Sequence, residues 1–180
     1  MTTTIQETEL RYPVGKFDFD APIEESQYPT LIAQIAEAPG ALRSAVAGLS
    51  RDHLETRYRP GGWTVKQVVH HVPDSHLNAY TRFKLALTEN EPTIKPYDEA
   101  RWAELVDART APVELSLALL DSLHKRWVLL LRSLSAADCS RRFRHPELGE
   151  VTLEKNLALY AWHARHHVAH ITSLRQRMGW

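Results

Sequence analysis

The sequence predicts an all-α protein built as a four-helix bundle. Four long stretches carry apolar residues at helical spacing, and no stretch alternates apolar and polar residues convincingly, as a half-buried strand would. Segments that contain proline, glycine and polar residues separate these stretches. Four amphipathic helices can bury their apolar faces against one another in one bundle. An irregular all-α domain is the alternative, because the connections are long enough for a more complex path.

The N-terminal part of the chain predicts an arm followed by one domain. Residues 1–27 are polar and contain two prolines and a glycine, so we expect an extended arm packed on the domain. Residues 28–180 should form a single metal-binding bundle. Its first helix is expected over about residues 28–50, with a kink or a break at Pro39 and Gly40.

The second helix has a recognisable start. Thr64 can cap it, and Gln67 stands three residues later, as in a capping box. We expect this helix to run to about Thr88. Residues 91–110 contain two prolines and should form a long connection with one short turn.

The third and fourth helices are also delimited by local signals. Proline is tolerated in the first turn of a helix, so the third should begin near Pro112 and run to about Leu134. Residues 141–151 contain Pro146 and Gly149 and are expected to form a loop. Thr152 should cap the fourth helix, which we expect to end near Met178.

Composition restricts the function and the location of the protein. The 180 residues suffice for one domain with a substantial core, and 43% of them are hydrophobic. Lys plus Arg equals Asp plus Glu, which disfavours a nucleic-acid partner. No apolar run is long enough to span a membrane, and the N-terminus has no secretory signal pattern. The single cysteine, Cys139, fits a reducing compartment, and we expect a cytoplasmic protein.

Histidines are concentrated in the last helix. Four of the ten histidines lie within residues 163–170, and on a helix residues four apart point the same way. His163 and His167 fall at the centre of the face that should be buried. His170 lies near that face and His166 about 60° away. Two imidazoles on consecutive turns can chelate a transition metal, but a catalytic site needs a third ligand.

The second helix is the expected source of that ligand. His71 and His76 lie at opposite edges of its apolar stripe, and either could reach the interior of the bundle. His70 lies nearly opposite the stripe and should face water or a partner. A polar strip shares the side of His71 and would suit the lining of a pocket; it consists of Thr64, Gln67, Ser75, Asn78 and Arg82.

The remaining histidines are expected to have no part in the site. His124 stands beside Lys125 and Arg126 and should be exposed or lie at an interface. His53 and His145 lie in or beside loops.

Several segments resemble the DinB-like superfamily, and within it the YfiT-type group of metal-dependent hydrolases. Residues 60–72 (PGGWTVKQVVHHV) resemble the first metal-ligand segment, and residues 160–171 (YAWHARHHVAHI) resemble the second. Residues 11–17, 82–88 and 177–180 are also similar to that group. The resemblance therefore extends over nearly the whole chain.

The resemblance implies a fold, a ligand set and an assembly. The four helices would run up-down-down-up, and the protein would be a homodimer with one divalent metal ion per subunit. His71, His163 and His167 would be the ligands, and His170 would support the site from beside them. Zinc and nickel are the expected metals, because open three-histidine sites suit them.

The implied activity is hydrolysis of a small-molecule substrate by water that the metal activates. One alternative is transfer of a low-molecular-weight thiol of the bacillithiol type, since a metal also lowers the pKa of a thiol. A second is a non-catalytic metal-binding or stress-related dimeric module. No general base can be identified. Asp74 is a candidate to support a ligand, and Arg82, Tyr160 and His170 are candidates to bind substrate.

Overall fold

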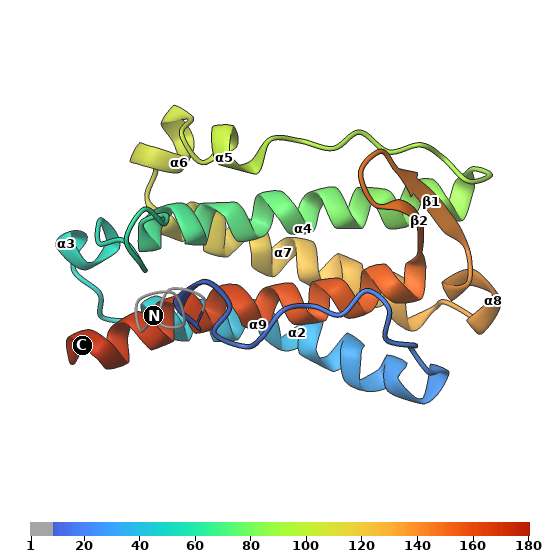
Figure 1. The fold of residues 1–180 in the computed structure, drawn as a ribbon, viewed down its shortest axis with the longest axis horizontal. Helices are drawn as coiled ribbons and strands as arrows, with labels where there is room; N and C mark the ends of the chain where they lie inside the picture. The colour runs from blue at the N-terminus through green and yellow to red at the C-terminus, as the bar shows by residue number, and fades with distance from the viewer. Residues whose placement is uncertain (1–8) are drawn as a thin grey trace, which may run out of the picture.

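Four long helices packed side by side make up the body of the protein (Figure 1). The computed structural model describes residues 9–180. The long helices are α2 (Tyr28–Val46), α4 (Val65–Thr88), α7 (Val113–Arg132) and α9 (Leu153–Met178). The prediction of an all-α four-helix bundle is confirmed, and a small two-stranded sheet is added to it.

The ends of these helices follow the local signals in the sequence. The Thr64 side chain accepts a hydrogen bond from the backbone N–H of Gln67, whose own side chain accepts one from the backbone of Thr64. Thr152 caps α9 in the same way, accepting from the backbone N–H of Lys155. At the other end of α9, Gly179 takes a left-handed conformation with φ of 73°, which suits a residue without Cβ.

The helices run up-down-down-up. Helices α4 and α7 point the same way in Figure 1, while α2 and α9 point the opposite way. Each of α4 and α2 packs against both α7 and α9. The antiparallel neighbours α4 and α9 therefore share one long interface, and they carry the histidines of interest. Residues 89–112 return along the outside of the bundle from the end of α4 to the start of α7.

Some local expectations were wrong. Helix α2 continues through Pro39 and Gly40 without a break. Residues 141–151 were expected to be a loop, but this region forms the antiparallel hairpin of β1 (Arg142–His145) and β2 (Gly149–Thr152). The connection after α4 contains two short helices instead of one turn. The shorter elements are η1 (Glu25–Gln27), α3 (Arg51–Leu54), α5 (Glu99–Trp102), α6 (Val106–Thr110) and α8 (Ala136–Cys139).

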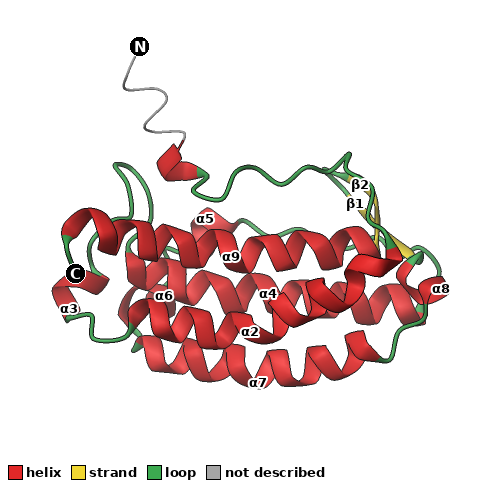
Figure 2. Cartoon of the chain, turned by 90° about the horizontal axis from the view of Figure 1, so that it is seen from below, coloured by secondary structure: helices red, strands yellow, loops and turns green. Residues whose placement is uncertain are grey.

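The described part of the N-terminal arm runs along α9 (Figures 1 and 2). The indole N–H of Trp162 donates to the carbonyl of Gly15, and the Lys155 ammonium donates to the carbonyl of Ala21. Phe17 also contacts Trp162, with ring centroids 5.9 Å apart. Residues 1–8 of the predicted arm lie outside the described residues.

The apolar core is divided into two clusters along the bundle. One cluster surrounds Trp127 and Phe83 near the hairpin, and the other surrounds Val68 and Leu120 near the opposite end. On α4 and α9, four buried histidines lie between the residues of the two clusters: His76, His166, His167 and His170. Polar groups thus occupy the middle of the bundle, where a purely structural core would be apolar.

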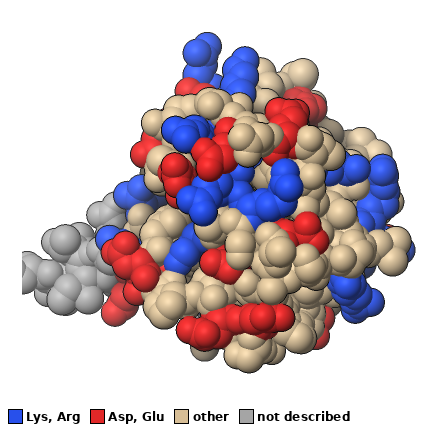
Figure 3. Space-filling model, turned by 90° about the vertical axis from the view of Figure 1, so that its right-hand side faces the viewer, with Lys and Arg blue, Asp and Glu red and all other residues tan. Residues whose placement is uncertain are grey.

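The outer surface at the hairpin end carries charges of both signs side by side (Figure 3). Ion pairs join Arg142 to Glu150 at 3.0 Å and Arg144 to Glu91 at 2.7 Å. None of the helices within residues 9–180 is both long and apolar enough to cross a lipid bilayer.

Candidate metal centre

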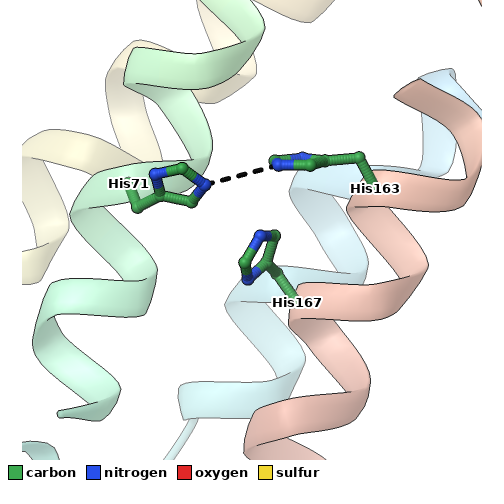
Figure 4. A group of neighbouring side chains, drawn as sticks. All are labelled: His71, His163 and His167. Carbon is green, nitrogen blue, oxygen red and sulfur yellow. Dashed lines mark hydrogen bonds between the residues drawn. The ribbon is translucent and has the colours of Figure 1, made fainter. Parts of the chain in front are cut away.

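Three histidines from two helices meet in the middle of the bundle. His71 projects from α4, and His163 and His167 project from consecutive turns of α9 (Figure 4). One ring nitrogen from each lies within 4.8 Å of the other two. Nε2 of His71 is 3.3 Å from Nε2 of His163. The structure thus brings together the three residues that the sequence analysis named as metal ligands.

The donor set suits a divalent transition metal. Two nitrogens that each lie about 2.0–2.1 Å from a tetrahedral zinc are about 3.3–3.4 Å apart, close to the spacing between His71 and His163. Nδ1 of His167 is buried and has no hydrogen-bond partner among the described residues. Three neutral imidazoles fill part of a coordination shell and leave space for a further ligand.

The environment keeps these imidazoles unprotonated. Burial, together with a smaller contribution from the nearby His170, lowers the pKa of His71 to about 3. Burial also holds the pKa of His163 and His167 well below the usual value, and the other histidines of the cluster act in the same direction. An unprotonated imidazole keeps the lone pair that a metal ion needs.

A cavity of about 570 Å³ opens beside His163. Its walls come from α4, α9, the connection after α4 and the hairpin. The lining residues are Ser75, Arg82, Pro96, Tyr97, Asp98, Glu99, His145, Glu147, Leu148, Leu159, Tyr160 and His163. A volume of this size accommodates a small organic molecule.

Two of the candidate substrate-binding residues line this cavity. Arg82 and Tyr160 both contribute to its wall. The Tyr160 hydroxyl lies 3.3 Å from the Ser75 hydroxyl, which is itself 3.4 Å from Nε2 of His163. Burial raises the pKa of Tyr160, so the phenol keeps its proton at neutral pH. Of the predicted polar strip, only Ser75 and Arg82 reach the cavity, and Gln67 instead binds the carbonyl of Ala103.

The other two candidates occupy different surroundings. Within residues 9–180, Asp74 makes no hydrogen bond to an imidazole, and burial together with Asp107 raises its pKa to about 6. His170 is buried, stacks on Tyr58 with ring centroids 4.0 Å apart, and bonds through Nε2 to the carbonyl of Arg11 at 3.0 Å. His170 therefore connects the cluster to the N-terminal arm.

Three expectations about the remaining histidines were wrong. His70 is buried rather than facing water, because α7 packs beside that face of α4; its Nδ1 lies 2.7 Å from the Ser116 hydroxyl. His124 is only 1% exposed, since it lies one turn after Leu120 on the apolar face of α7. His145 lines the cavity, because the predicted loop is a hairpin that covers this side of the bundle.

His163 has further neighbours. His76, which the sequence analysis left beside His71 as able to reach the interior, is fully buried, and its Nε2 lies 3.1 Å from Nδ1 of His163, on the side of the ring away from His71. Tyr97 and Glu147 reach the cavity from segments that were expected to be loops. The helical position of His124 could have revealed its burial, whereas no sequence pattern indicated Tyr97 or Glu147.

Comparisons with known proteins point to one family. A model of the DinB superfamily matches residues 34–171. A protein of Bacillus cereus (strain B4264) named "Putative metal-dependent hydrolase" is 57% identical over 172 residues, which cover 96% of this chain and 99% of the relative.

Solved structures share the fold. YfiT from Bacillus subtilis, described as a probable metal-dependent hydrolase with an unusual four-helix bundle topology, aligns with a TM-score of 0.92 and 50% identity. That alignment covers 96% of this chain and 99% of YfiT. The four-helix bundle protein TT2238 aligns with a TM-score of 0.55 and 20% identity over 78% of this chain and 94% of its own, a likeness of fold alone.

Proposed function

Since the chain belongs to the DinB superfamily, we propose that it is a metal-dependent hydrolase with one divalent metal ion held by His71, His163 and His167. The observation that carries the proposal is the convergence of three neutral imidazoles from α4 and α9, with two Nε2 atoms 3.3 Å apart. Zinc or nickel is the proposed metal, because imidazole nitrogen suits both. When bound, such an ion polarises a substrate carbonyl and makes water acidic enough to supply hydroxide near neutral pH.

The cavity beside His163 is the proposed substrate site. Arg82 carries a positive charge on its wall and would bind an anionic or strongly polar group of the substrate. Tyr160 and Ser75 would orient the reacting group, because both line the cavity with His163 and the Ser75 hydroxyl lies 3.4 Å from Nε2 of His163. Tyr97 and His145 close the cavity from the connection after α4 and from the hairpin.

Metal analysis tests the ligand set. Protein purified without an affinity tag should contain about one divalent metal ion per chain by mass spectrometry. His71→Ala and His163→Ala should each lose most of this metal. His70→Gln is the matched control, because His70 is the neighbouring buried histidine but bonds to α7. If neither alanine variant loses metal, the ligand assignment is wrong.

An activity screen tests the reaction. The metal-loaded protein should cleave members of a panel of small esters and amides, and His71→Ala should not. The same panel, with electrophiles added, should be run with a bacillithiol-type thiol. Turnover that depends strictly on the thiol would show that the reaction is thiol transfer and not hydrolysis. Full metal occupancy without turnover of any compound would favour a non-catalytic metal-binding module.

The assembly is a separate part of the proposal. Homodimer formation is supported by the family resemblance, and sedimentation velocity of the metal-loaded protein tests it. A single species at the mass of one chain, 20.6 kDa, would contradict it.

A further inference from the structure

We propose that His76 and His124 are positioning residues that hold His163 in one tautomer, with its Nε2 lone pair toward the metal centre. The backbone carbonyl of Ile35, which accepts a hydrogen bond from His124, sets the tautomers of both rings. The role of His163 as a ligand rests on the proposed function, whereas the tautomer follows from the hydrogen bonds among the histidines.

A continuous chain of hydrogen bonds leads away from His163. Nδ1 of His163 lies 3.1 Å from Nε2 of His76, and Nδ1 of His76 lies 2.8 Å from Nε2 of His124. Nδ1 of His124 then lies 2.6 Å from the carbonyl oxygen of Ile35. His76 is 0% exposed and His124 is 1% exposed, so water does not compete for these contacts. The chain joins α9, α4, α7 and α2 in turn.

The carbonyl at the end of the chain fixes its direction. A carbonyl oxygen can only accept, so Nδ1 of His124 must carry the proton and donate it. A neutral imidazole has one donor and one acceptor, which makes Nε2 of His124 an acceptor for Nδ1–H of His76. By the same step, Nε2 of His76 accepts from Nδ1–H of His163. Nε2 of His163 is then left with its lone pair.

The Ile35 carbonyl is free to accept because of a proline in α2. In an α-helix the carbonyl of residue i normally accepts from the N–H of residue i+4. Residue i+4 from Ile35 is Pro39, which has no N–H and lies inside the continuous helix. The proline therefore leaves one carbonyl without its helical partner, and His124 of the adjacent helix supplies the missing donor.

The direction of the chain matters for metal binding. The free Nε2 of His163 lies 3.3 Å from Nε2 of His71, where a shared metal ion would be held. If the chain ran the other way, Nε2 of His163 would carry a proton and could not coordinate. Groups that hold the second nitrogen of a ligand histidine typically change metal affinity by about 10–100-fold.

The tautomers can be measured in the metal-free protein. With ¹⁵N-labelled histidine and a chelator present, long-range ¹H–¹⁵N correlation spectra at pH 7.5 distinguish Nδ1–H from Nε2–H rings. We expect Nδ1–H rings at His124, His76 and His163. In His124→Phe, which removes both polar atoms but keeps an aromatic ring, His163 should become a mixture of tautomers. Zinc affinity, from competition with a chromophoric chelator, should fall about 10–100-fold.

Two further variants separate positioning from packing. His124→Gln keeps a donor for Ile35 and an acceptor for His76, so it should restore the tautomer and most of the affinity. His70→Gln changes a buried histidine of α4 that takes no part in these hydrogen bonds, so it should leave the tautomers and the zinc affinity unchanged. If His124→Phe does not fold, the wild-type and His124→Gln spectra still decide the assignment.

The outcomes distinguish this inference from the proposed function. An Nε2–H ring at His163 in the wild type, or unchanged tautomers and affinity in His124→Phe, overturns the inference. If the wild-type protein shows the expected tautomers but binds no zinc or nickel, the proposed function is overturned, while the direction of the hydrogen bonds from His163 to Ile35 is supported.

Discussion

His170 lies beside the three clustered histidines but outside their group of converging nitrogens. Nε2 of His170 donates to the carbonyl of Arg11, because a carbonyl can only accept. Nδ1 of His170 keeps its lone pair, but His170 is not one of the three histidines whose ring nitrogens lie within 4.8 Å of one another, although its ring centroid lies 5.3 Å from that of His167. We expect His170→Ala to keep about one metal ion per chain, with affinity reduced less than 10-fold. In the same metal analysis, a loss as complete as that of His71→Ala would make His170 a ligand.

The surroundings of the only cysteine make its thiol unreactive. Cys139 is buried, and burial together with Glu154 raises the pKa of its thiol to about 11. The thiolate is the reactive form, so a rise of about two pKa units lowers its population about 100-fold. Reaction with a disulfide reagent at pH 7.5 should be at least that much slower in the native protein than in urea. Equal rates in the two states would mean that the thiol is accessible and ionised.

At the residue scale, the sequence indicated which histidines come together better than it indicated what surrounds them. The angular argument placed His163 and His167 on the buried face of α9, but it left His71 and His76 as equal alternatives. In the structure both are buried, and they contact opposite nitrogens of His163. A single-helix projection cannot show this, because it does not contain the neighbouring helices. His70 was misjudged for the same reason.

At the element scale, long helices with capping signals could be predicted and short pieces could not. Thr64 and Thr152 begin α4 and α9 as expected. The two strands of the hairpin have only four residues each, too few to show an alternating pattern. Pairing across the strands places Phe143 opposite Val151, both buried, and this contact has no local sequence signature.

The cap at the start of α4 also gives a stability prediction. Thr64→Ala removes the acceptor for the N–H of Gln67, so the free energy of unfolding should fall by about 1 kcal/mol. Urea denaturation of the metal-free protein measures this change. Thr81→Ala is the control on the same helix, because its exposed hydroxyl bonds only to the carbonyl of Leu77 in the preceding turn. A loss no larger than that of Thr81→Ala would show that the cap does not contribute.

At the scale of the whole molecule, the long connection explains the order of the helices. Helices α4 and α7 are parallel neighbours, so the chain must return along the length of α4 before α7 begins. A helix of 24 residues is about 36 Å long, which no tight turn can span. The sequence predicted a long connection at residues 91–110. Only the family resemblance implied that the helices before and after it would run parallel. The return segment also supplies Tyr97 and other cavity residues.

The buried histidines make the folded state sensitive to acid. Burial is the first cause of a lowered pKa at nine histidines: His70, His71, His76, His124, His145, His163, His166, His167 and His170. The pKa falls to about 3 at His71 and His166, and to about 4 at His124 and His170. Between these values and the usual 6.5, the unfolded chain binds more protons than the folded one. Stability is therefore full above about pH 6.5 and decreases as the pH falls.

The size of the effect predicts acid unfolding of the metal-free protein. Each such histidine contributes up to about 1.4 kcal/mol per pH unit below its unfolded pKa, so four remove at most about 6 kcal/mol between pH 6.5 and 5. This is comparable with the whole stability of a typical domain, about 5–15 kcal/mol. Urea midpoints measured by circular dichroism with a chelator present should fall steeply from pH 7.5 to 5. Saturating zinc should move the loss to lower pH, because the metal binds unprotonated imidazoles of the folded state. Midpoints that do not change over this range would show that the histidines protonate without unfolding, contrary to the burial of the cluster.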